Sequence, residues 1–160
     1  MSLQKNLLAT LVIYSFWTVV DGSGDVDREE VQRRMQLGAE ELKKFGLSEV
    51  EKKMTRMEGL FRLHSSEGLK NVFHDRAKLK FGDFVFQGID EIVLWFQTMV
   101  YKDGIDQFHF SRHLKYDEKT TNVKSSGFLI IGYGMFEYSL SAARDENYDY
   151  YLDSLQIWIP

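Results

Sequence analysis

The spacing of hydrophobic residues changes partway along the chain, and this change predicts the order of its elements. Up to about residue 100, apolar residues recur mostly three or four positions apart, as on one face of an α-helix. From Asp106 onward they alternate with polar residues, which is the period of a half-buried β-strand. Helices followed by a meandering antiparallel sheet are typical of the α+β class. We expect N-terminal helices packed in a curved antiparallel sheet, which together form a small cone.

The first half predicts several helices. Segment 27–45 is highly charged with one thin apolar edge, and we expect it to be a solvated helix that ends at Gly46. Ser48 and Glu51 then match a capping box at the start of a strongly amphipathic helix. Asp90 is positioned to cap a later helix, whose apolar face includes Trp95. Between these two helices, residues 77–86 predict either a small hairpin that turns at a Gly-Asp pair or a strand with a kink there.

The second half predicts three long strands. Residues 106–116 alternate, with Phe108, Phe110 and Arg112 on one face and two histidines, His109 and His113, on the other. Residues 128–140 are apolar on both faces, which predicts a central strand covered on each side. The last strand is expected from Tyr148 to Ile159.

Composition and the N-terminus suggest where the protein acts. The chain has 160 residues, 44% of them hydrophobic, and a net charge of −4, which predicts one domain and no nucleic-acid partner. Residues 1–22 contain a lysine, then an uncharged apolar run, then small residues up to Gly22, which predicts a secretory signal peptide. A first helix of the fold and a membrane-tethering anchor are the alternatives. The expected location is extracellular, with no stable membrane span after cleavage.

The remaining chain divides by composition into a charged linker and helix, 23–47, and a domain, 48–160. It contains no cysteine, so the domain must be stable without disulfides, and thiolate metal sites are excluded. No phosphate-binding loop, zinc-protease motif or hydrolase nucleophile motif is present, and we expect no metal and no cofactor.

Two short phrases resemble the nuclear transport factor 2-like superfamily, which includes SnoaL-like cyclases, ketosteroid isomerase and scytalone dehydratase. They are Phe73-His-Asp-Arg-Ala-Lys-Leu, at the entry to a strand, and Gln87-Gly-Ile-Asp-Glu-Ile, at a strand–helix corner. The resemblance covers about residues 48–159 and implies a cystatin-like roll, a cone-shaped sheet around helices. The chain departs from the family pattern because Arg76 intervenes between Asp75 and Ala77, and because only three long strands are visible after the last helix.

Enzymes of this superfamily use a carboxylate or imidazole base inside the cone, with Tyr or Asp donors opposite. For the interior pocket we predict Tyr133, Glu137, Tyr151, Trp95 and Met135 as lining residues. The pairs His74-Asp75 and His109/His113 are interpreted as structural, since side chains four residues apart on a strand lie roughly 13 Å apart. Catalytic residues are not assigned.

Two functions follow from the resemblance. The first is a secreted, non-catalytic domain that binds a small apolar ligand or a protein partner, and that forms a homodimer through its sheet face. The alternative is a dehydratase or isomerase with a base in the cone. A lining of Phe, Leu and Met would favour the binding domain, and a buried titratable group facing a tyrosine would favour the enzyme.

Overall fold

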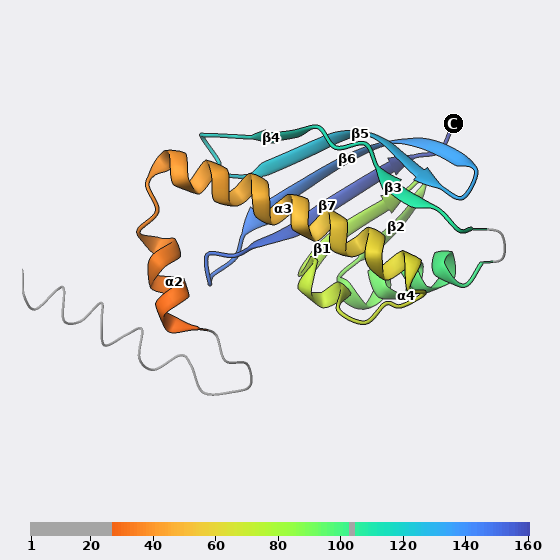
Figure 1. The fold of residues 1–160 in the computed structure, drawn as a ribbon. Helices are drawn as coiled ribbons and strands as arrows, with labels where there is room; N and C mark the ends of the chain where they lie inside the picture. Colours follow the sequence, from red (N-terminus) through yellow and green to blue (C-terminus); the bar gives the residue numbers. More distant parts are fainter. Residues whose placement is uncertain (1–26, 103–104) are drawn as a thin grey trace, which may run out of the picture. The chain divides into compact units, whose positions relative to one another are not determined.

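The computed structural model describes residues 27–102 and 105–160 and divides into two units, 1–30 and 31–160, of which the second carries the fold (Figure 1). The predicted signal peptide lies outside the described residues. The helices are α2 (Arg28–Met35), α3 (Ala39–Arg62), the short 3-10 helix η1 (Leu69–Asn71) and α4 (Ile89–Val100). The strands are β1 (Phe73–Phe81), β2 (Phe84–Gln87), β3 (Phe108–Phe110), β4 (Leu114–Tyr116), β5 (Val123–Ile131), β6 (Gly134–Arg144) and β7 (Tyr150–Trp158).

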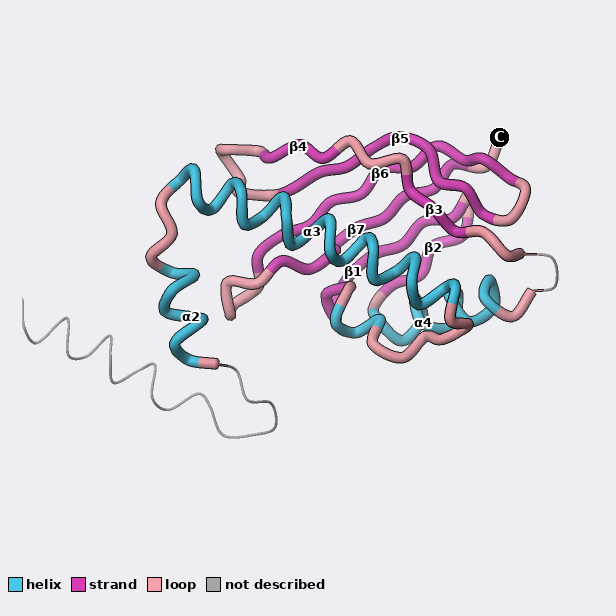
Figure 2. Tube along the Cα trace, in the orientation of Figure 1, coloured by secondary structure: helices cyan, strands magenta, loops and turns pink. Residues whose placement is uncertain are grey.

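All seven strands join one curved sheet, which confirms the α+β class (Figure 2). Its order is β2-β1-β7-β6-β5-β3, and β4 also pairs with β5. The sheet is mixed, because β1 and β7 run parallel, so the expectation of a purely antiparallel sheet is wrong at this one pair. The β1–β7 register shifts between Phe73 and Lys78, and this irregularity contains Arg76, the residue that departs from the family phrase.

Helix α3 runs unbroken from Ala39 to Arg62, so the predicted helix end at Gly46 and the capping box at Ser48 are wrong. The chain instead breaks at Gly38, whose N–H donates to the Glu41 carboxylate at the true start of the helix. Gly46 is buried, and a Cβ there would lie 2.8 Å from the Tyr150 ring. Glycine therefore serves close packing at this position rather than helix termination. The boundary drawn between residues 47 and 48 falls inside this helix.

The hairpin at residues 77–86 is confirmed in β1 and β2, and the later helix starts at Ile89, one residue before the predicted cap. The predicted central strand 128–140 is wrong, because the chain turns at Gly132-Tyr133, between β5 and β6. This turn divides the predicted strand into two strands, β5 and β6. Within residues 106–116 the structure forms two short strands, β3 and β4, separated by residues 111–113, so the prediction of one long strand is wrong. Both strands pair with β5 in the same register, and the predicted alternation of faces is confirmed.

The inner face of the sheet is the face that α3 and α4 cover, and the opposite face is called the outer face. Helix α3 packs against β3, β4, β5 and β7, and α4 packs against β1 and β2 (Figure 1). The space between helices and sheet is filled by fully buried side chains, the largest of which include Tyr138, Tyr150, Phe61, Phe73, Phe96 and Phe110. The inner face is thus an aromatic core into which few polar groups project.

Candidate functional site

Three of the predicted pocket residues lie away from the inner face. Tyr133 is 93% exposed at the β5–β6 turn, and Met135 and Glu137 are exposed on the outer face of β6. The physical reason is the missed turn, because a strand that ends at Ile131 and restarts at Gly134 resets which residues share a face. Their predicted position in the interior is therefore corrected.

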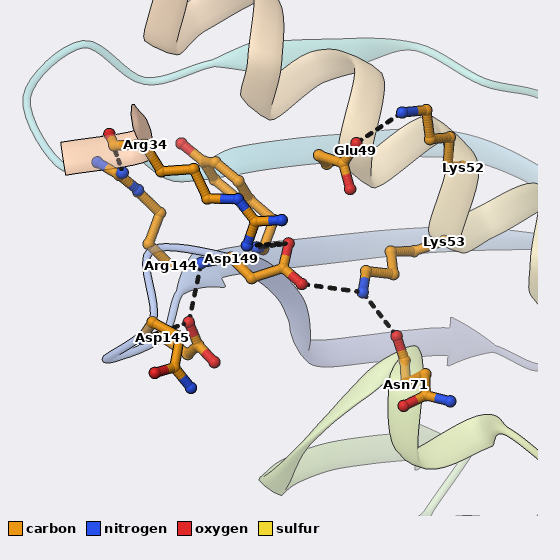
Figure 3. A network of polar contacts seen from close by, with 10 residues as sticks. Arg34, Glu49, Lys52, Lys53, Asn71, Arg144, Asp145 and Asp149 are labelled. Carbon is orange, nitrogen blue, oxygen red and sulfur yellow. Dashed lines mark hydrogen bonds and ion pairs between the residues drawn. The ribbon is translucent and has the colours of Figure 1, made fainter. Parts of the chain in front are cut away.

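A polar network at the start of β7 includes Lys53, Asn71 and Asp149 (Figure 3), and Tyr151 contacts it through Lys53. The Lys53 ammonium lies 4.2 Å from the centre of the Tyr151 ring, donates to the Asn71 carbonyl at 2.7 Å, and is 3.6 Å from the Asp149 carboxylate. Burial lowers the pKa of Lys53 and raises the pKa of Tyr151. Arg34 also reaches Asp149, at 3.9 Å. This network connects α3, η1 and β7. The Tyr151 ring takes part in it through a cation–π contact with Lys53.

A second polar group is centred on Glu58, which projects from the apolar side of α3 and is 7% exposed. One carboxylate oxygen accepts the Phe110 N–H at 2.9 Å and lies 3.2 Å from Nδ1 of His109. The other oxygen accepts from the Arg112 guanidinium at 2.5 Å. Glu58 therefore fastens α3 to the edge formed by β3 and β4, and both of its oxygens are occupied.

Tyr138 carries a buried hydroxyl on the inner face, close to this edge. Its O–H donates to the Ser111 carbonyl at 2.8 Å, and the Ser125 hydroxyl lies 2.8 Å away and is left to donate to Tyr138. Burial raises the pKa of Tyr138. The Tyr138 hydroxyl thus donates one hydrogen bond and accepts another within the protein. It has a structural role in the core and is not free to bind a ligand.

Trp95 is the one predicted pocket residue that the structure places in the interior. It is 4% exposed, and within the described residues its indole N–H finds no acceptor. Ring centroids of Phe81, Phe86 and Phe96 lie 5.7, 6.4 and 6.4 Å from the Trp95 ring. The ring centroid of Phe136 lies 6.2 Å from that of Phe81 and so extends the group by one ring. We call Trp95 with Phe81, Phe86, Phe96 and Phe136 the aromatic cage.

The outermost rings of the aromatic cage are only half-buried. Phe81 and Phe86 lie near the β1–β2 turn and Phe136 lies near the β5–β6 turn, so these rings close the cage at the end of the sheet. The cage thus combines apolar walls with a single unsatisfied donor. A buried donor without a partner costs roughly 1–3 kcal/mol, which an acceptor atom placed there would recover.

Two of the remaining histidine candidates, His74 and His109, have local partners. Nδ1 of His74 accepts the Arg76 N–H at 3.1 Å, and His109 contacts Glu58 rather than another histidine. Across residues 27–102 and 105–160, no group of three or more His, Asp or Glu residues could hold a metal ion.

Sequence reasoning missed the Glu58–Arg112 pair, although a signal was present. Each residue is the charged member of an otherwise apolar row, Glu58 among Met54, Met57 and Phe61 on the helix, and Arg112 beyond Phe108 and Phe110 on the strand. A buried charge requires an opposite charge. The single acid in the helix row and the single base in the strand row could therefore have been predicted to form an ion pair.

The comparisons with known proteins agree with this architecture. The sequence matches no protein-family profile and no curated protein. Among solved structures, the chain is similar to an uncharacterized protein with a cystatin-like fold from Caulobacter vibrioides, with a TM-score of 0.61 and 11% identity over 72% of this chain and 89% of that one. It is also similar to "Rd1NTF2_04 with long sheet", with a TM-score of 0.55 and 14% identity over 68% and 98% of the two chains.

A third similar structure is a scytalone dehydratase-like protein from Novosphingobium aromaticivorans, with a TM-score of 0.52 and 12% identity over 69% of this chain and 80% of that one. Identities this low establish the fold alone. The chain therefore has the nuclear transport factor 2-like fold that its two phrases implied.

Proposed function

We propose that this chain is a secreted, non-catalytic domain of the nuclear transport factor 2-like type that binds a small apolar ligand carrying a hydrogen-bond acceptor. The observation that supports it is Trp95, whose buried N–H has no acceptor within the described residues and is surrounded by aromatic rings. A flat apolar molecule with a carbonyl group matches both properties, because its rings stack in the aromatic cage and its oxygen accepts from Trp95.

Entry requires little rearrangement of the fold. Phe81, Phe86 and Phe136 are half-buried at strand ends beside turns, so their rings can rotate without disturbing the buried centre of the sheet. When these rings rotate outward, the ligand occupies the space that they leave beside Trp95.

The catalytic alternative, a dehydratase or isomerase, needs a base free to accept a proton from a bound molecule. Among the described residues, Glu58 is the buried carboxylate, and both of its oxygens already accept from Phe110 and Arg112. Tyr138 is likewise engaged with Ser111 and Ser125. These contacts favour a binding role over a catalytic one.

A matched pair of probes tests the ligand proposal. 2-Acetylnaphthalene and 2-isopropylnaphthalene have nearly the same shape, and only the first carries an acceptor. We expect the acetyl compound to bind about tenfold more tightly, because satisfying one buried donor contributes about 1.4 kcal/mol. Isothermal titration calorimetry measures both affinities.

The control variant is Trp95→Phe, which keeps an aromatic ring and removes the N–H. In this variant the two probes are expected to bind with equal affinity. Equal affinities in the unmodified protein, or a preference that survives the substitution, would contradict the proposal. Failure of both probes to bind would also contradict it.

Secretion is tested separately. When the full chain is expressed in cells with a secretory pathway, we expect protein in the medium with a mass that corresponds to cleavage after Gly22. Retention of the intact chain inside the cells would refute this part of the proposal. Among the residues that the structure describes, no helix is long and apolar enough to cross a membrane.

A further inference from the structure

Three strand ends lie side by side at one end of the sheet, the end where Figure 1 marks the C terminus. They are the turn between β1 and β2, the turn between β5 and β6, and the end of β7. The registers bring them together, because β1 pairs with β7 as far as Phe81 and β6 pairs with β7 as far as Trp158. A Cβ at Gly82 would lie 2.9 Å from the side chain of Ile159, so the first turn and the residue after β7 are neighbours.

Large apolar side chains are exposed at all three strand ends. Phe84 begins β2 and is 69% exposed, and Tyr133 lies exposed in the β5–β6 turn. Three more exposed residues, Met135, Trp158 and Ile159, lie at the neighbouring ends of β6 and β7. We call these five residues the apolar rim. Exposed apolar side chains gathered in this way mark a surface that binds a protein or a membrane.

Charged side chains are scarce at the apolar rim and begin behind it. Asp83 is the one charged side chain in the three strand ends, residues 81–85, 131–135 and 158–160. The next charges along the strands are Lys80 on β1 and Glu137 on β6. By the rise per residue they lie roughly 7 and 13 Å behind the two turns. This nearly uncharged layer is as deep as the roughly 5–10 Å to which proteins bury apolar groups at a membrane surface.

We infer that the apolar rim docks onto a bilayer of neutral phospholipids, and that the ligand of the aromatic cage enters the protein from this bilayer. The inference rests on the proposed function, because it names the source of that ligand. The rim consists of turn tips and strand ends, which can insert between lipid headgroups. Trp158 and Tyr133 belong to the two residue types that are enriched at membrane–water interfaces.

The charges near the apolar rim favour a neutral bilayer over an anionic one. Asp83 and Glu137 are acidic, and Lys80 is the one base beside them. The whole chain has a net charge of −4. Recognition of anionic lipids relies on clusters of about four to eight basic residues. Docking therefore depends on apolar insertion and not on headgroup charge.

The apolar rim is continuous with the mouth of the aromatic cage. Phe81 of the cage pairs with Phe84 of the rim across the β1–β2 turn, and Phe136 of the cage follows Met135 in the chain. A ligand dissolved among lipid acyl chains can therefore reach Trp95 without crossing water. This route avoids exposing the ligand to water, which costs about 25 cal/mol for each Å² of apolar surface.

Site-specific labelling measures whether the apolar rim enters the bilayer. The chain contains no cysteine, so Tyr133→Cys provides a single attachment site for the fluorophore nitrobenzoxadiazole. Lys119→Cys is the control, because Lys119 is also exposed in a turn but lies at the opposite end of β5. With phosphatidylcholine vesicles, we expect the label at position 133 to brighten and its emission to shift to shorter wavelength. The label at position 119 is expected to remain unchanged.

Charge substitutions measure the contribution of the apolar rim to vesicle binding. Ile159→Glu in the rim and Met35→Glu on α2 are matched, because each residue is 45% exposed. Met35 lies at the other end of the sheet, where the neighbouring Arg34 carbonyl accepts from Arg144 at the end of β6. In vesicle flotation, Ile159→Glu is expected to raise the lipid concentration for half-maximal binding at least about tenfold, and Met35→Glu less than about threefold. Both variants carry the same N-terminal segment, so their difference reports the rim alone.

Ligand binding in solution separates this inference from the proposed function. Without vesicles, Ile159→Glu is expected to bind 2-acetylnaphthalene within about threefold of the parent protein, and circular dichroism verifies that it is folded. A label at position 133 that responds no more than the label at position 119 would overturn the inference and leave the ligand site intact. Equal effects of the two charge substitutions would also overturn it, as would stronger binding to vesicles that contain phosphatidylserine. Failure of the parent protein to bind 2-acetylnaphthalene would instead contradict the proposed function, and with it the entry of a ligand from the bilayer.

Discussion

Replacing Glu58 with alanine is expected to lower the free energy of unfolding by about 3 kcal/mol, because removing one member of a buried ion pair leaves the other uncompensated. The Arg112 guanidinium loses its 2.5 Å partner, and the Phe110 N–H loses its acceptor at the edge strand. Both losses fall at the contact that fastens α3 to β3 and β4. Urea denaturation monitored by tryptophan fluorescence measures the change.

Glu51 supplies the matched control. Its carboxylate also lies near Arg112, at 3.8 Å, but its side chain is 58% exposed to solvent. An exposed ion pair contributes at most about 1 kcal/mol, so Glu51→Ala is expected to have a small effect. Similar losses of unfolding free energy in the two variants would show that Glu58 contributes no more than a surface ion pair, and would contradict its role in holding α3 against β3 and β4.

Alanine at two glycines of the same helix is expected to change stability in opposite directions. Gly46→Ala places a methyl group 2.8 Å from the ring of buried Tyr150, whose hydroxyl is held by the Thr121 carbonyl at 2.7 Å. Overpacking of this kind costs about 1–3 kcal/mol, which exceeds the gain of about 1 kcal/mol in helix propensity. We therefore expect net destabilisation.

Gly59→Ala is the counterpart, because nothing lies within 4 Å of the added methyl group. This variant is expected to be more stable than the parent protein by up to about 1 kcal/mol. Thermal unfolding of both variants measures the difference. If Gly46→Ala also raised the melting temperature, the close packing of α3 against Tyr150 would be wrong.

The sequence predicted those features that depend on local periodicity. The alternation of residues 106–116 divided the residues of β3 and β4 between the two faces of the sheet correctly, and the Gly-Asp turn indicated the first hairpin. Local patterns gave wrong predictions at glycines, because a glycine can end a helix, permit close packing or adopt a positive φ in a turn. Gly46 was interpreted as a helix end, although it permits close packing, and Gly132 was placed inside a strand, although it adopts a positive φ of 57° in a turn.

The candidate site was less predictable because it depends on contacts between distant segments. The missed turn at Gly132 moved Tyr133, Met135 and Glu137 from the expected interior to the solvent. Trp95 was identified correctly as interior, since it lies on the apolar face of an amphipathic helix. That its N–H lacks an acceptor follows only from the arrangement of β1, β2 and β6 around it, which no local pattern encodes.

The most direct test of the proposed function is the indole N–H signal of Trp95 in a ¹H–¹⁵N NMR spectrum, assigned by its disappearance in Trp95→Phe. Adding 2-acetylnaphthalene is expected to move this proton signal downfield, because the carbonyl oxygen accepts its hydrogen bond. Adding 2-isopropylnaphthalene is expected to produce no comparable downfield shift. A Trp95 signal that responds to neither compound, or equally to both, would contradict a ligand site built on this donor.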